Sequence, residues 1–208
     1  MPSPIYITST AAICKNVAFK DGVPIFENKG ISLFDFLQNL YQHLAISYPK
    51  FYKMDMLCKL GFLASEILIH PSVHINKYNP YETGIVLSNA QSSLDNDCKY
   101  VETMNTNPSP SLFVYTLPNI LIGEICIRNK IKGESAFFIS DNFNVEFIEK
   151  YIENLFNNNN LQACICGWVD VLGEDYNAVL FYLEKEKTEK AILFNRENIY
   201  KVYQINNG

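Results

Sequence analysis

The sequence has little basic charge and no long apolar run, and each shortage excludes a class of function. Lys and Arg number 17 against 22 Asp and Glu, so the net charge is −5. A basic face that would bind nucleic acid or an anionic membrane surface is therefore not expected. The longest apolar runs, such as Ile122–Ile127 (IGEICI), contain or border charges and are too short to span a bilayer.

The first ten residues lack the basic stretch that begins a signal peptide, so we expect none. Most of the six cysteines lie in apolar periodic segments, and we expect them to be reduced and buried. Cys164 and Cys166 would share one face of a strand, which is not a spacing typical of a metal site. The six cysteines are Cys14, Cys58, Cys98, Cys126, Cys164 and Cys166. Because we expect them to be reduced, the sequence predicts a cytoplasmic protein.

Apolar residues are abundant, which favours an ordered protein with a real core. The chain of 208 residues is 48% hydrophobic and 13% aromatic. We find no internal repeat and no clear linker, so we expect one domain over 1–208. Strand-like segments alternate with helix-like ones, which predicts an α/β fold with a mixed sheet covered by helices on both faces.

Apolar periodicity gives the expected elements. Strands are expected at 5–10, 83–88, 135–139, 163–169, 178–183 and 191–194, and the last two are expected to pair as an antiparallel hairpin. Helices are expected at 33–44 with Ser32 as N-cap, at about 53–69, around Leu94–Val101, at 119–131 and at 145–156. The segment with Gly22, Pro24 and Gly30 is expected to be a loop, and the helix at 119–131 to be buried all round.

One junction could hold a nucleophile. The strand Ser135–Ile139 runs into a polar turn of Ser140, Asp141 and Asn142, and a helix follows at once. In many α/β enzymes a strand–turn–helix junction carries the reactive residue. Asn142 has a structural interpretation as the cap of that helix, because Asn is favoured there.

Four stretches, in the same order, resemble the N-terminal half of a β-ketoacyl-[acyl-carrier-protein] synthase of the thiolase-like fold. Asn107–Ile139 is similar to the family's loop, buried helix, "KG" turn and the strand that leads to the nucleophile. Lys53–Leu68 resembles its second helix, Glu82–Met104 its next strand, turn and helix, and Leu161–Val171 the strand after the nucleophile helix. The likeness runs from about Ile5 to about Glu184.

Two departures from the family follow from this resemblance. The position of its nucleophilic cysteine falls on Asn142, or on Asp141 or Ser140 if the turn length differs, and none of these side chains is a thiol. The family also takes two histidines from its C-terminal half, and this sequence ends where that half would begin. His43, His70 and His74 lie far upstream. Condensation by the family's mechanism is therefore not expected.

The remaining candidates have two interpretations each. By resemblance, the loop with Leu112 and Phe113 would line an acyl pocket, although Phe113 could equally belong to the core. Asn142 could retain a role in acyl recognition instead of capping. His70 and His74 are four apart, but Pro71 interrupts their helix, so we expect no metal site. We expect no cofactor.

The resemblance implies a catalytically inactive, synthase-like subunit. It would act like a chain-length factor in fatty-acid or polyketide-type synthesis, with aryl polyene or flexirubin pigment pathways as plausible settings. Its partner would be a second copy or a full-length ketosynthase, paired through the strand Ser135, Ala136, Phe137, Phe138 and Ile139, with an acyl carrier protein as a further partner. The alternative is an acyl-thioester hydrolase or transferase that uses Ser140 or Asp141.

Overall fold

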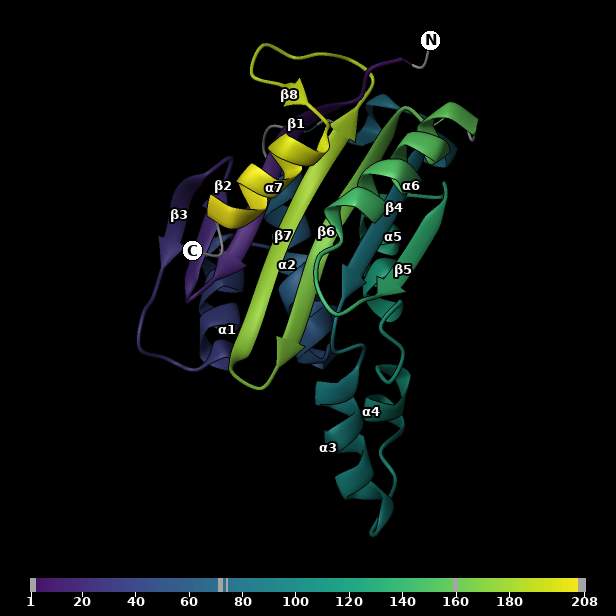
Figure 1. Ribbon diagram of the computed structural model, residues 1–208. Helices are drawn as coiled ribbons and strands as arrows, with labels where there is room; N and C mark the ends of the chain where they lie inside the picture. Colours follow the sequence, from purple (N-terminus) through teal and green to yellow (C-terminus); the bar gives the residue numbers. More distant parts are fainter. Residues whose placement is uncertain (1–2, 71–72, 74, 159–160, 206–208) are drawn as a thin grey trace.

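The computed structural model describes residues 3–70, 73, 75–158 and 161–205. These form one mixed β-sheet with helices on both faces, as the sequence predicted, and a pair of helices that projects from one end (Figure 1). None of the helices in the described ranges is both long enough and apolar enough to cross a membrane.

The sheet has the strand order β3-β2-β1-β7-β6-β4-β5, and the short β8 pairs with β1. β4 runs parallel to both β5 and β6, and the other pairs are antiparallel. The strands of the described residues are β1 (Tyr6–Cys14), β2 (Val17–Lys20), β3 (Val23–Glu27), β4 (Thr83–Asn89), β5 (Ser135–Ile139), β6 (Ala163–Leu172), β7 (Asp175–Glu184) and β8 (Ile192–Leu193).

One face of the sheet is covered by α1 (Leu33–His43), α2 (Met56–Ile69) and α5 (Ile120–Asn129). α2 is buried along almost its whole length, so it lies between the sheet and the outer elements. At Gly61 a Cβ would lie only 2.6 Å from side-chain atoms of Leu121, which explains how α2 and α5 approach so closely. A short 3-10 helix, η1 (Pro49–Lys53), lies outside them and buries Phe51.

The opposite face is covered by α6 (Val145–Asn158) and α7 (Arg196–Ile205). Ile148 and Ile152 of α6 and Ile199 of α7 are fully buried against the sheet. The outer side of this layer is charged: Arg196 forms ion pairs with Glu146 and Glu149. This layer therefore has an apolar inner side and a polar outer side.

Two further helices, α3 (Leu94–Met104) and α4 (Pro110–Val114), form the projecting pair, which we call the arm (Figure 1). α3 follows the C-terminal end of β4, and α4 leads into α5, which returns along the body to the start of β5. Because β4 and β5 are parallel, the arm lies at the C-terminal end of β5.

Several expectations were wrong. The expected loop at Gly22 and Pro24 is the hairpin β2–β3. The expected hairpin near the end of the sequence does not form, because 192–193 pair with β1. The helix expected at 119–131 is not buried all round, since Ile127 is 65% exposed.

Candidate functional site

The strand–turn–helix junction forms as expected, with β5 ending at Ile139 and α6 beginning at Val145. The cap is Asn144, whose side-chain oxygen accepts a hydrogen bond from the backbone N–H of Phe147 at 3.0 Å. The prediction that Asn142 caps this helix was therefore wrong. Asn142 is exposed and lies in the turn.

The turn holds no group that is prepared for covalent chemistry. The Ser140 hydroxyl donates to the backbone carbonyl of Asn142 at 2.8 Å. Within the described residues, no histidine or carboxylate is hydrogen-bonded to this hydroxyl, and a serine nucleophile needs such a base. Asp141 and Asn142 are exposed. The arrangement offers neither a thiolate nor an activated hydroxyl.

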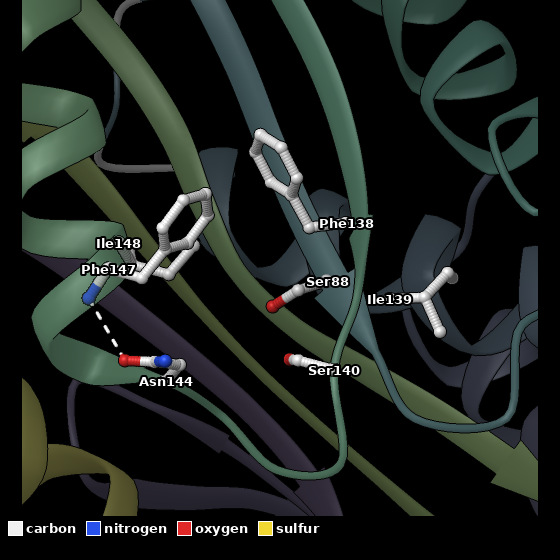
Figure 2. A pocket seen from close by; sticks show the side chains of 7 residues that line it. All are labelled: Ser88, Phe138, Ile139, Ser140, Asn144, Phe147 and Ile148. Carbon is white, nitrogen blue, oxygen red and sulfur yellow. Dashed lines mark hydrogen bonds between the residues drawn. The ribbon is translucent and has the colours of Figure 1, made fainter.

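A hollow of about 210 Å³ lies beside this turn, between the ends of β4 and β5 and the first turn of α6 (Figure 2). Its wall is apolar, with the ring of Phe138 edge-on to the ring of Phe147 at 4.8 Å. Ser88 and Ser140 supply hydroxyls on its polar side, and Ser88 donates to the carbonyl of Gly167. The hollow has room for a small apolar group. Its lining residues are Ser88, Phe138, Ile139, Ser140, Asn144, Phe147 and Ile148.

The acyl-pocket candidates lie in the arm and do not line this hollow. Phe113 is 59% exposed, so it does not belong to the hydrophobic core of the described residues. The carbonyl of Leu112 accepts a hydrogen bond from the side chain of Asn96 in α3. Both side chains therefore belong to α4 of the arm and not to the hollow beside the turn.

The segment proposed as a dimer strand, Ser135–Ile139, is β5 at one edge of the sheet. Phe137 packs against the core under α2 and α5, and Phe138 packs against the core under α6. Ile139 is 53% exposed. The outer edge of β5 pairs with no other strand of the described residues, so it is free to pair with another chain.

The cysteines and histidines lie elsewhere. Cys164 and Cys166 are buried on the same face of β6, and burial raises the pKa of both thiols. Cys98 is exposed, and burial raises the pKa of Cys126 to about 11.

The histidines lie far from the turn in the sequence. The ring of His43, which is exposed, lies 4.8 Å from the ring of Phe26. His70 ends α2, and His74 is outside the described residues. The described residues contain no cluster of three or more His, Cys, Asp or Glu that could hold a metal ion.

No protein-family model and no curated protein matches this sequence. Solved structures do match. A chain in the complex of a type II PKS acyl-carrier protein with its ketosynthase bound to the hexaketide is similar over 88% of this chain, with a TM-score of 0.61 and 15% identity. This chain has the ketosynthase fold.

Two structures with a chain length factor have the same fold. The ketosynthase ApeO in complex with its chain length factor ApeC from Xenorhabdus doucetiae matches over 88% of this chain, with a TM-score of 0.57 and 12% identity. The ishigamide ketosynthase/chain length factor matches over 91%, with a TM-score of 0.59 and 16% identity. The chain spans 64% of the matched chain in the first and third structures and 79% in the second.

Helix α7 was not expected from the sequence. Arg196, Glu197 and Tyr200 of α7 face Asn142 to Val145 of the turn across a second, open hollow of about 580 Å³. The spacing of Ile199, Val202 and Tyr203 is helical and could have predicted this element. The turn is therefore flanked by two helices rather than one.

Proposed function

We propose that this protein is a catalytically inactive ketosynthase-like subunit that supports an active ketosynthase, as a chain length factor does, in fatty-acid or polyketide-type synthesis. Aryl polyene or flexirubin pigment pathways are the settings that we propose for it. The observation that carries the proposal is the turn between β5 and α6, which has the strand–turn–helix form but contains Ser140, Asp141 and Asn142 in place of a cysteine.

The chemistry of the turn supports a role without covalent catalysis. A ketosynthase subunit that transfers an acyl chain must first hold it as a thioester, which requires a reactive thiol. The carboxamide of Asn142 cannot form one, and the hydroxyl of Ser140 is engaged with a backbone carbonyl. The hydrolase alternative through Ser140 or Asp141 has no supporting contact among the described residues.

The edge of the sheet supports a role in assembly. We propose that the ketosynthase partner pairs with β5 antiparallel along its open edge, so that the two sheets become continuous. Leu112 and Phe113 of the arm then face the partner and could form part of the wall of its acyl pocket. An exposed Phe113 fits such a position better than a position in this subunit's own core.

The test is reconstitution with each full-length ketosynthase of the source organism and with its acyl carrier protein. Alone, the chain is expected to acquire no acyl adduct from an acyl-carrier thioester, as measured by intact-protein mass spectrometry. Together with its ketosynthase it is expected to form a 1:1 complex and to alter the product length. Phe113→Ala is expected to shift the length distribution, and the exposed Phe34→Ala, in α1, serves as the matched control.

An adduct on the chain, or thioester turnover that Ser140→Ala abolishes, contradicts this proposal and supports the hydrolase or transferase. Unchanged product length with every ketosynthase also argues against it.

A further inference from the structure

The hollow beside the turn has room for a benzene ring that carries one substituent. Its volume is about 210 Å³. In another protein, an apolar cavity of about 150 Å³ is sufficient to bind benzene. Two residues of the lining are exposed, since Phe147 is 39% exposed and Ile139 is 53% exposed. The hollow therefore reaches the surface, and a small ligand can enter it from solvent.

The wall of the hollow favours a flat aromatic ligand. The rings of Phe138 and Phe147 meet edge-on, with centroids 4.8 Å apart and planes at 85°, and both side chains border the hollow (Figure 2). Ile148, which is fully buried, also lines it. Aromatic rings prefer edge-on or offset contacts with centroids about 4.5–7 Å apart. A third ring in the hollow can therefore pack against the two that are present.

The polar side of the hollow offers hydrogen-bond acceptors and no charge. The Ser140 hydroxyl donates to the carbonyl of Asn142 at 2.8 Å, and the Ser88 hydroxyl donates to the carbonyl of Gly167 at 3.3 Å. A serine hydroxyl has one proton and two lone pairs, so both oxygens can still accept. The described residues that line the hollow include no acid and no base, so a charged ligand would find no counter-charge. The hollow therefore suits a neutral ligand that donates a hydrogen bond.

Size, ring contacts and acceptors together describe one class of ligand. We infer that the hollow binds a phenol, that is, a neutral aromatic ring with a hydroxyl group. The ring lies against Phe138 and Phe147, and its hydroxyl donates to a serine oxygen on the polar side. This inference goes beyond the proposed function, which requires no ligand on this subunit. Two sources supply such a ring: a free phenol and the aryl end of an acyl thioester.

Titration of the isotope-labelled full chain with phenol, followed by nuclear magnetic resonance, tests the site. Saturable shifts are expected for the amide signals of Ser88, Ser140 and Ile148. Phe147→Ala is expected to weaken phenol binding about tenfold, because a ring contact and its apolar area are lost. Phe147 is partly exposed, so folding should be unaffected. Phe34→Ala, at an exposed position of α1 on the opposite face of the sheet, is the matched control and should leave binding unchanged.

A matched pair of ligands tests the hydrogen bond. Fluorobenzene has nearly the size of phenol but has no O–H donor. Combined replacement of Ser88 and Ser140 by Ala is expected to weaken phenol binding about tenfold. Fluorobenzene binding should stay unchanged, because fluorobenzene makes no use of the serine oxygens. An equal effect on both ligands would show that the substitutions disturb the turn and that the hydroxyl is not recognised, which contradicts the inference.

A para-hydroxybenzoyl thioester of N-acetylcysteamine decides between the two sources. Tighter binding of this thioester than of phenol assigns the hollow to the aryl end of an acyl group, and weaker binding assigns it to free phenols. Phenol that gives no saturable shifts overturns the inference, and so does equal binding by the Phe147→Ala and Phe34→Ala variants. Either result leaves the proposed function standing, because reconstitution with a ketosynthase measures that function separately.

Discussion

At the scale of single residues, Gly167 shows how tightly the centre of the sheet is packed. It lies in β6 with φ of +154°, a backbone conformation that side-chain-bearing residues rarely adopt. A Cβ built there would lie 2.1 Å from the carbonyl oxygen of Val179 in β7, which no small shift can accommodate. The position therefore requires glycine for both conformation and space.

We expect Gly167→Ala to destabilise the protein by more than about 3 kcal/mol, because backbone strain and a backbone clash add together. Chemical denaturation followed by circular dichroism measures this. Gly173→Ala is the matched control: Gly173 has φ of +61° but open space around it, so its loss should be about 1 kcal/mol. Equal losses of unfolding free energy for Gly167→Ala and Gly173→Ala would show that the clash with the carbonyl oxygen of Val179 does not contribute.

At the scale of elements, an ion pair between the partly exposed Arg128 and the buried Glu66 links α5 to α2. The guanidinium of Arg128 binds both carboxylate oxygens of Glu66 at 3.0 Å, and Glu66 is 3% exposed. The ring of Tyr48 lies 5.5 Å from that guanidinium and covers it. A carboxylate so deeply buried depends on its partner.

Replacement of Arg128 by Met is expected to destabilise the protein by about 3–5 kcal/mol, because the carboxylate of Glu66 is left buried without its counter-charge. Lys29→Met serves as the control, since the ion pair of Lys29 with Glu27 is well exposed, and its loss should be under about 1 kcal/mol. Thermal unfolding at low and high salt checks both, and only the exposed pair should respond to salt.

The helices and strands also show how much of the fold the sequence could predict. Helix α1 was predictable because Ser32 caps it and its apolar residues recur at helical spacing. β2 and β3 were missed because Gly22 and Pro24 suggest a loop, whereas Gly22 turns the hairpin and Pro24 lies on an edge strand. The partner of β8 and the cap at Asn144 could not be predicted, because the first depends on a distant pairing and the second on the turn length.

At the scale of the whole molecule, α7 closes the face of the sheet that α6 leaves open. Ile199 is fully buried, and the ring of Tyr203 lies 5.0 Å from that of Phe143. The single tryptophan, Trp168, is 5% exposed and lies 6.1 Å from the same Phe143 ring. The cover on this face therefore depends in part on α7, whose helical spacing of apolar residues was overlooked in the sequence.

Truncation of Ile199 to Ala is expected to cost about 2–5 kcal/mol and to move the fluorescence emission of Trp168 to longer wavelength. Tyr200→Ala, at the neighbouring and 52% exposed position, should change neither quantity appreciably. An unchanged spectrum and an unchanged unfolding midpoint for Ile199→Ala would mean that α7 does not cover this face.

The pairing of β1 with β7 has a consequence for how the protein is made. Ile7 pairs with Leu183, so β1 is synthesised long before β7, its neighbour on the side away from β2. Until then, the edge of β1 that will pair with β7 has no partner strand. Contacts between such remote segments form slowly. We therefore expect the nascent protein to remain available to chaperones for longer than a protein whose contacts are mostly local.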